Sequence, residues 1–487
     1  MQHFQTVKRH DKPRAVSFST RSKQGSGFQY GLFAELGQHK ARNNREESDQ
    51  TIMAVAEQSL RNGTLNKVRT GDSSIHDWYR FVLSFPPHLV KDYLLKFDVS
   101  SSQKVLDPFC GTGTTIVECK KLGIESVGIE ANPMAHFASC VKVDWSPHPE
   151  KLWAHAERIA NEVQDRLAMV DSFIEPFSQC PRAGGGELRR LDEEANKLLL
   201  SNSISPIPLH KALVLLERIT NSRKHEFVSH ERLALAKALV YSISNLHFGP
   251  EVGVGKPKAD APVVSSWLDN AKSMVYDLSI QKANSVSATV HCADSRQMLD
   301  IIAPKSIDAV ITSPPYPNEK DYTRTTRLES VLLGFIATKQ DLRELKQGLV
   351  RSNTRNVYKS DDDDLLVADN QEVQRIADQI ERRRIELGKT SGFERLYARV
   401  TRLYFGGMKR HLSDLRHVLK PGAKLAYVVG DQASYLRVMI RTGELLAEIA
   451  ESLGFEIIGI DLFRTRLSTA TREQLREEVV LLRWPGQ

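Results

Sequence analysis

The tetrapeptide that follows the apolar stretch IDAVIT has the residue types of a loop that could act on an amino group: Ser313, Pro314, Pro315 and Tyr316. Two consecutive prolines fix the backbone and remove two N–H donors, so the loop presents acceptors in a rigid array. The exocyclic amine of cytosine or adenine is a poor nucleophile, because its lone pair is delocalised into the ring. Acceptors at Ser313 Oγ and the Pro314 carbonyl would favour a pyramidal nitrogen and stabilise the positive charge that develops on it.

Tyr316 supports the same interpretation. Its ring offers a flat face for a base that has swung out of its helix, which chemistry on a base requires. The alternative is a proline-rich turn that follows a strand and has no chemical role. That alternative weakens if the same sheet also carries a cofactor-binding turn.

A glycine-containing segment, DPFCGTGTT, begins at Asp107, where an expected strand ends and a helix begins. Gly111 and Gly113 let the backbone approach a ligand closely, because a Cβ would collide with it. Glu130 ends the next expected strand, where a carboxylate can accept hydrogen bonds from both ribose hydroxyls of an adenosyl group. The Asp107 carboxylate suits a methionine amino group, and Ile116 stands where a dinucleotide fingerprint has its third glycine. We therefore expect S-adenosylmethionine, with NAD or a purely structural turn as alternatives.

Two further groups of residues have open assignments. Asp294, in the stretch CADS, could accept a hydrogen bond from the adenine amino group, or could simply cap a helix. Between residues 321 and 359, eight basic residues stand against four acidic ones. Such residues give salt-dependent phosphate contacts, although a solvated helical face is the alternative. The residues nearest the Ser-Pro-Pro-Tyr loop are the expected nucleic-acid contacts: Lys320, Tyr322, Arg324 and Arg327.

Alternating strand and helix patterns surround these residues. KVLDPF predicts a buried strand, GTGTTIVECKKLG a turn that enters a helix, and SVGIE a second strand, which together make a β-α-β unit. Strand patterns return in SATVH, IDAVI, AKLAYVVG, FEIIGIDLF and EEVVLLRW. We expect an α/β fold with a Rossmann-like, doubly wound methyltransferase sheet, interrupted by a large helical insertion and a second, smaller insertion.

The chain divides accordingly into six expected parts. They are a basic N-terminal extension (1–75), a cofactor-binding half (76–144), a helical insertion that could read the target (145–285), the catalytic-loop part (286–337), a charged insertion (338–392) and a C-terminal part (393–487). Within the extension, residues 48–61 predict an amphipathic helix. Residues 182–186 and 248–262 have the glycine and proline content of loops.

Composition narrows the class of protein. The chain has a formal net charge of +7, which permits a polyanionic partner without requiring one. Its five cysteines are widely spaced, so neither a disulfide framework nor a structural zinc site is expected, and we expect no metal. No apolar run is long enough to span a membrane and no signal peptide is recognisable, which predicts a cytoplasmic protein.

The motifs DPFCGTGTT, GIEANP, CADS and TSPPY together resemble the DNA amino-methyltransferases of the N4-cytosine/N6-adenine group. The upstream stretch DWYRFVLSFPPHLV looks like the segment that closes over the methionine end of the cofactor, and LKPGAKLAYVVGD looks like the fifth strand. The resemblance implies catalysis by Ser313, Pro314, Pro315 and Tyr316. It also implies S-adenosylmethionine binding by Phe85, Asp107, Phe109, Gly111, Gly113, Thr114, Thr115, Glu130 and Asp294.

Ser313 also bears on the target base. In the family that the motifs resemble, serine at this position is more typical of cytosine-N4 enzymes, and aspartate or asparagine of adenine-N6 enzymes. We therefore expect N4 of cytosine in double-stranded DNA, with the target base flipped. Adenine N6, a tRNA or rRNA base, and a non-catalytic nucleic-acid-binding protein remain alternatives. The enzyme could serve a restriction or defence protein, or act alone. The cofactor half comes first here, whereas many cytosine-N4 relatives begin with the catalytic half, so the element that reads the target stays open.

Overall fold

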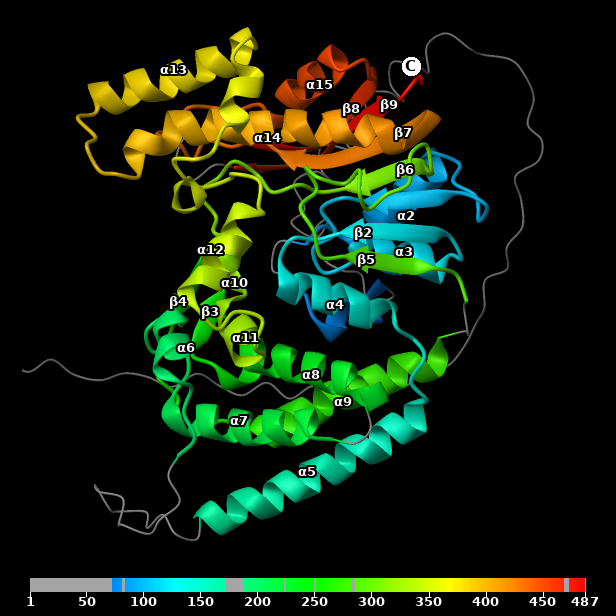
Figure 1. Cartoon of the computed structure of the whole chain (residues 1–487), viewed down its shortest axis with the longest axis vertical. Helices are drawn as coiled ribbons and strands as arrows, with labels where there is room; N and C mark the ends of the chain where they lie inside the picture. The colour runs from blue at the N-terminus through cyan, green and yellow to red at the C-terminus, as the bar shows by residue number, and fades with distance from the viewer. Residues whose placement is uncertain are drawn as a thin grey trace, which may run out of the picture. The chain divides into compact units, whose positions relative to one another are not determined.

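A seven-stranded, mostly parallel sheet forms the centre of the protein, which was analysed as a computed structural model (Figure 1). In spatial order its strands are β5 (Ala288–His291), β2 (Glu125–Ile129), β1 (Lys104–Asp107), β6 (Ile307–Thr312), β7 (Leu419–Gly430), β9 (Gln474–Arg483) and β8 (Glu456–Leu467). Neighbouring strands are parallel from β5 to β7, and β9 is antiparallel to both of its neighbours. This confirms the predicted doubly wound α/β fold.

The structure describes residues 72–80, 84–171, 188–222, 225–248, 251–281, 285–467 and 473–486. All of them belong to one structural unit, Glu57–Gln487. The predicted helix at 48–61, nearly all of the expected basic extension and the predicted loop at 182–186 lie outside the described residues. No helix in the described ranges has the length and apolar character needed to cross a membrane.

The order of the strands reverses next to β1. From β1 the chain proceeds outward to β2 and β5, whereas β6 pairs with the opposite side of β1, with Val105 opposite Ala309 and Leu106 opposite Val310. In an open α/β sheet, ligands bind outside the carboxyl ends of the strands at such a switch point. The fold therefore directs attention to the loops that follow β1 and β6.

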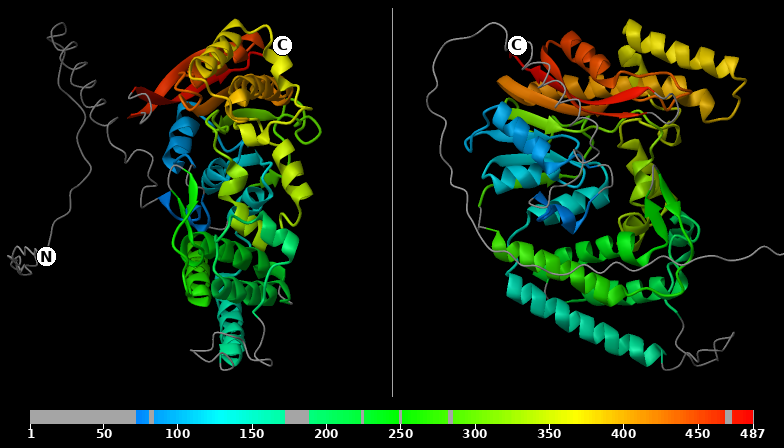
Figure 2. Two further views of the ribbon diagram at one scale, coloured as in Figure 1. Left: turned by 90° about the vertical axis from the view of Figure 1, so that its left-hand side faces the viewer. Right: turned by 180° about the vertical axis from the view of Figure 1, so that it is seen from behind.

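Both faces of the sheet are apolar, because helices cover both. Val105 packs with α2 (Pro87–Lys96), which lies in front of the strands in the right-hand view of Figure 2. The next residue, Leu106, packs on the opposite face with α14 (Tyr397–Val418). Successive strand residues point to opposite faces, which explains why these short strands are continuous apolar runs in the sequence.

Two helices carry the turns that follow β1 and β2. Helix α3 (Thr114–Lys121) begins after Gly113, and α4 (Pro133–Val143) begins after Asn132. The Asn132 side chain accepts hydrogen bonds from the backbone N–H groups of Met134 and Ala135, and proline occupies the first turn, where its missing N–H costs nothing. The same amide donates to Thr326 Oγ1 over 3.1 Å, which ties α4 to the segment after the catalytic loop.

The first insertion is largely helical and lies below the sheet in Figure 1. Its helices are α5 (Pro149–Asp171), α6 (Glu193–Leu198), α7 (Pro206–Thr220), α8 (His225–Ala238), η3 (Leu239–Ile243) and α9 (Val263–Ile280). The predicted loop at 248–262 is wrong in its first part, where β3 (Leu246–Phe248) and β4 (Val252–Val254) form an antiparallel hairpin. Strands this short show no alternation in sequence, and Gly253 serves packing, since a Cβ there would lie 2.5 Å from the His247 ring.

The second insertion lies between the catalytic loop and α14. After the short helices α10 (Tyr322–Thr325) and α11 (Arg327–Leu332), it comprises α12 (Lys339–Gln347), η4 (Thr354–Asn356), η5 (Asp363–Val367) and α13 (Gln371–Glu386). Another short helix, η2 (His76–Trp78), precedes α2. The chain then passes through η6 (Glu394–Leu396) into α14, and α15 (Thr442–Ser452) covers the C-terminal strands. Val373, Ile376 and Ile380 of α13 join the core beneath α14, so this charged segment is a packed part of the domain.

Candidate active site

A cavity of about 440 Å³ opens at the switch point of the sheet. Its volume is in the range of pockets that bind cofactors and other small ligands. One side is formed by the turns after β1 and β2, and the other by the loop after β6. The lining includes eleven of the residues predicted from the sequence: Phe85, Phe109, Gly111, Thr114, Glu130, Ser313, Pro314, Pro315, Tyr316, Lys320 and Tyr322.

The two loops are hydrogen-bonded to each other through the ends of their strands. Thr312 Oγ1 donates to Asp107 Oδ1 over 2.6 Å, and Thr115 Oγ1 donates to the Ile311 carbonyl over 3.0 Å. Asp107, Thr115 and Thr312 are fully buried beneath the cavity rather than exposed in it. Asp107 and Thr115 therefore support the turn from below.

The turn after β1 depends on its glycines. Gly111 and Gly113 have φ angles of 54° and 87°, in the left-handed region that side chains disfavour. A Cβ on Gly113, which does not line the cavity, would also lie 3.0 Å from Ser139 Cβ. The buried Lys142 donates to the Thr112 carbonyl over 2.9 Å, and burial lowers the pKa of its ammonium to about 7. Nothing in the sequence pattern indicated this lysine, because it lies in the last turn of α4, where basic residues are common.

Glu130 lines the cavity beside the glycine turn. Its carboxylate accepts hydrogen bonds from the N–H groups of Gly111 and Asn132, both over 2.7 Å, and each oxygen has a further lone pair. Burial raises its pKa to about 7. Glu130 therefore orients the glycine turn and is able to accept ribose hydroxyls.

Asp107 provides an acceptor that the described residues leave without a donor. Its Oδ1 accepts from Thr312 and from the Phe109 N–H, whereas Oδ2 is buried and has no hydrogen-bond partner in the described part of the chain. Burial raises the pKa of this carboxyl to about 6. Buried acceptors are normally satisfied, so Oδ2 has capacity for a further donor such as an ordered water or a ligand group. With the cavity volume and Glu130, it fits the methionine and adenosyl groups of S-adenosylmethionine.

The loop after β6 lines the cavity with Ser313, Pro314, Pro315 and Tyr316. Ser313 Oγ donates its proton to the Val428 carbonyl over 3.0 Å, so its remaining lone pairs can accept. Tyr316 lies against the end of β7, where a Cβ on Gly430 would come within 3.1 Å of its ring. Burial raises the pKa of the Tyr316 hydroxyl, so it stays protonated near neutral pH. Its apolar surroundings raise the pKa of Tyr322 to about 12 in the same way.

Residues from β8 and β9 also line the cavity, and sequence reasoning missed them. Arg464 binds both oxygens of Glu477, over 2.6 and 2.8 Å, and Arg466 lies beside the same carboxylate at 3.5 Å. Their position next to Lys320 follows from sheet topology, which the sequence does not reveal. The available signal was the basic character of FRTRLSTATREQLRE.

Three predicted residues have other contacts. Asp294 pairs with Arg296 over 2.6 Å and accepts from its backbone N–H over 2.9 Å, which closes a local turn. The next element in the chain is β6, so the alternative prediction of a helix cap is wrong. Arg327 donates to the Thr323 carbonyl, to Thr323 Oγ1 and to the Leu198 carbonyl, so its donors hold α10 and α6 together. Arg324 is half-buried. None of the three lines the cavity.

Comparison with known proteins agrees with this arrangement. A family model described as DNA methylase matches residues 37–138, which include the glycine turn and Glu130. The chain is 28% identical over 445 residues to the Type II methyltransferase M.BsoBI of Geobacillus stearothermophilus, covering 85% of this chain and 84% of that protein. It is 24% identical over 453 residues to the Type II methyltransferase M.AvaI of Anabaena variabilis, covering 84% and 86%. A shorter match, 36% over 69 residues, is to M.MjaII of Methanocaldococcus jannaschii, and covers 14% of this chain and 13% of that one.

Proposed function

The chain belongs to the DNA amino-methyltransferase family, and on this premise we propose that it transfers a methyl group from S-adenosylmethionine to N4 of a flipped cytosine in double-stranded DNA. One observation carries the proposal: the glycine turn and the Ser-Pro-Pro-Tyr loop line the same cavity. A donor on one loop and an acceptor on the other would then be within reach of each other.

The cofactor half of the cavity has a residue for each part of S-adenosylmethionine, which when bound supplies an electrophilic methyl group. Asp107 Oδ2 would accept from the methionine ammonium, because it is a buried acceptor without another donor in the described structure. Glu130 would accept from the ribose hydroxyls. Phe85 and Phe109 provide apolar surface. The glycine turn would leave room for the ligand next to the backbone.

The base half accounts for activation of the amine. Ser313 Oγ, with its proton directed to the Val428 carbonyl, and the Pro314 carbonyl would accept the two amine N–H bonds. The nitrogen lone pair is then free to attack, and the same acceptors stabilise the positive charge that develops. Tyr316 would stack on the flipped base. Attack would be direct, with no covalent enzyme intermediate: the N–CH3 bond would form as the sulfonium S–CH3 bond breaks, and the amine would then release one proton to solvent.

Cytosine is proposed over adenine because Ser313 is a neutral hydroxyl at the position where the family's adenine-N6 members more typically have aspartate or asparagine. The named relatives are Type II methyltransferases. By analogy we propose that this enzyme methylates a specific sequence and protects it from a partner restriction or defence protein. If such a partner is present, deletion of this chain should leave the host DNA unmethylated and open to cleavage by the partner.

The decisive experiment gives the protein isotopically labelled S-adenosylmethionine with DNA or RNA of mixed sequence and then separates the nucleosides. We expect label in N4-methylcytosine from DNA. Label in N6-methyladenine would overturn the choice of base, and label only in RNA would overturn the choice of polymer. Ser313→Ala and Tyr316→Ala should abolish transfer while cofactor binding persists, which separates a failed reaction from a misfolded protein.

A further inference from the structure

Residues 348–354, here called the wall segment, form one side of the cavity and connect its two ends. Gly348, Leu349, Val350 and Ser352 line the cavity directly. The wall segment begins next to the CADS turn after β5 and ends next to the residues that follow the Ser-Pro-Pro-Tyr loop. It belongs to the charged second insertion, whose basic residues the sequence offered only as possible phosphate contacts.

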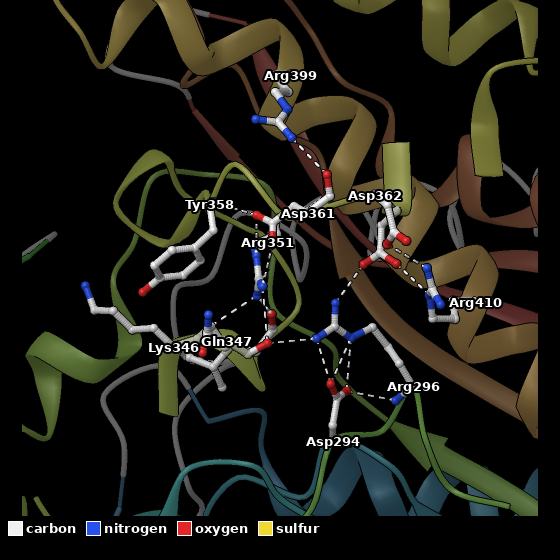
Figure 3. A network of polar contacts seen from close by, with 12 residues as sticks. Asp294, Arg296, Lys346, Gln347, Arg351, Tyr358, Asp361, Asp362, Arg399 and Arg410 are labelled. Carbon is white, nitrogen blue, oxygen red and sulfur yellow. Dashed lines mark hydrogen bonds and ion pairs between the residues drawn. The ribbon is translucent and has the colours of Figure 1, made fainter. Parts of the chain in front are cut away.

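The buried Arg351 fixes the backbone conformation at the start of the wall segment. The five N–H donors of Arg351 are matched by five hydrogen bonds: two to the Asp361 carboxylate (2.9 and 2.8 Å) and three to the carbonyls of Lys346, Gln347 and Leu349. The residue is only 4% exposed. Figure 3 shows the guanidinium between Asp361 and the end of α12. Arg351 is therefore a structural cation rather than a phosphate contact.

A second arginine ties the same region to the sheet. Arg296 pairs with Asp294 and Asp363, each over 2.6 Å, and donates to the Gln347 carbonyl over 3.1 Å (Figure 3). The acidic run Asp361–Asp364 packs directly against α14, since a Cβ on Gly406 would lie 1.8 Å from the Asp363 carbonyl oxygen. The backbone of the run therefore lies on α14, while the Asp363 carboxylate binds Arg296.

The other end of the wall segment fixes an unusual turn after the catalytic loop. Glu319 has a φ angle of 64°, which is uncommon for a residue with a side chain. Its carboxylate accepts from Thr354 N–H over 2.9 Å and from Thr354 Oγ1 over 3.0 Å. Its own N–H donates to the Ser352 carbonyl over 3.2 Å, and Asn353 donates to the Lys320 carbonyl over 3.1 Å. A backbone in this region persists only where its surroundings hold it.

The neighbours of Glu319 on both sides, Asn318 and Lys320, line the cavity a few residues beyond Tyr316. The left-handed turn at Glu319 determines how these two side chains enter the cavity. Within the described structure, hydrogen bonds of the wall segment reach the segment after the catalytic loop, and none reaches the glycine turn. Its influence therefore falls on the base end of the cavity rather than on the cofactor end.

We propose that the wall segment positions the target base, and that Glu319 and Asp361 are positioning residues for Asn318 and Lys320. This rests on the proposed function, because it assumes that the base end of the cavity receives a nucleotide. Neither residue touches the reacting atoms. Glu319 fixes the backbone between Asn318 and Lys320, and Asp361 acts one step further away, by holding Arg351 of the wall segment.

The test uses Thr354→Val, which keeps the shape of the buried side chain and removes one donor to Glu319, together with Glu319→Gln and Asp361→Asn. The matched control is Arg410→Ala, since Arg410 binds Asp362 and Asp363 from the outer side and contacts none of the wall segment. Steady-state transfer to DNA gives kcat and the KM for DNA, and calorimetry without DNA gives the Kd for S-adenosylmethionine. Thermal melting identifies any variant that has lost its fold.

We expect Thr354→Val, Glu319→Gln and Asp361→Asn, here called the wall variants, each to lose between about ten- and a hundredfold in kcat/KM for DNA, the range for a misplaced reactant. Their Kd for S-adenosylmethionine should stay near that of the wild type, and Arg410→Ala should change neither quantity. A folded Thr354→Val protein with wild-type kcat/KM for DNA would overturn the inference. So would an equal loss of cofactor affinity in the wall variants, since that describes a general structural role. A wild type that binds cofactor but methylates no DNA would overturn the proposed function itself, and the inference with it.

Discussion

The hydroxyl of Thr312 donates a 2.6 Å hydrogen bond to Oδ1 of Asp107. Thr312 is the last residue of β6 and Asp107 the last residue of β1, so this one bond couples the strand ends that carry the two halves of the site. It also fixes the Asp107 carboxylate with Oδ2 left for a ligand. Cofactor binding and the position of the catalytic loop are therefore linked at a buried contact.

Thr312→Val tests that link. The change keeps the shape but leaves a second buried oxygen of Asp107 without this donor, which should cost about 1–3 kcal/mol of stability. The Kd for S-adenosylmethionine should rise as well, because the carboxylate is no longer held in place. Melting and calorimetry measure both effects. Thr289→Val, at an exposed position of β5, is the control and should change neither.

Cofactor affinity should depend on pH near neutrality. Burial raises the pKa of Glu130 to about 7 and that of Asp107 to about 6, and only the ionised carboxylates accept on both oxygens. Affinity for S-adenosylmethionine should therefore increase as the pH rises from about 5.5 to 8. Glu130→Gln should bind more weakly and should lose the upper part of this dependence. A wild-type Kd that does not vary over this range would contradict both assignments.

The stability of the cofactor-free protein should decrease, rather than increase, as the pH rises over part of that range. Both carboxyls have a folded-state pKa above the ordinary value, so the folded chain holds more protons than the unfolded chain between about pH 4 and 7. Their contribution to stability is complete below that window and is lost as the pH rises through it. Saturating cofactor should reduce the loss, which melting curves with and without cofactor would reveal.

Lys142 should produce a separate dependence at higher pH. Its folded-state pKa of about 7 lies below the ordinary value of 10.5, so the unfolded chain holds the extra proton between these values. Its contribution to stability is therefore complete above pH 10.5 and is lost as the pH falls toward 7. Lys142→Met should remove this component of the melting curve. It should also weaken cofactor binding, since the Thr112 carbonyl loses its donor.

Arg466 should contact DNA phosphate at the mouth of the cavity. Its side chain is 42% exposed and lies 3.5 Å from Glu477, a loose pairing that leaves donors for a phosphate. Arg466→Ala should weaken DNA binding and lower the slope of log Kd against log salt by about 1. Arg483→Ala, at the far end of β9 and paired with Glu456, is the control. Equal effects of the two substitutions would count against a specific contact.

The parts of the fold that the sequence predicted are those governed by local rules. Two strands, the one that ends at Asp107 and the one before Ser313, are apolar runs followed by a residue that ends them. The glycine turn directly follows the first strand. The types and positions of these elements were therefore predicted correctly. Their meeting in one cavity followed from the expected sheet, since parallel strands present their carboxyl ends at the same edge.

The sequence did not reveal which charged side chains bind each other in the folded protein. Arg351 and Arg327 counted as basic residues available to phosphate, yet each has most or all of its donors bound inside the protein. Asp294 was expected to bind a ligand, but it binds Arg296, two residues away. Arg464 and Arg466 reached the cavity through strand order alone. A charge count gives the number of ions, but which of them remain free depends on tertiary contacts.

The first insertion leaves the sheet after α4, which follows β2, and returns to it at β5, which pairs with β2 residue for residue from Ser126 to Ile129. Its exit and re-entry are thus on neighbouring strands at one edge of the sheet. Its helices share one core with Ile116 of α3 and Met134 of α4, and Arg327 donates to the Leu198 carbonyl at the end of α6. A change of length or sequence in the insertion would therefore be transmitted to the elements that carry the glycine turn and the catalytic loop, so these parts of the chain would have to change together.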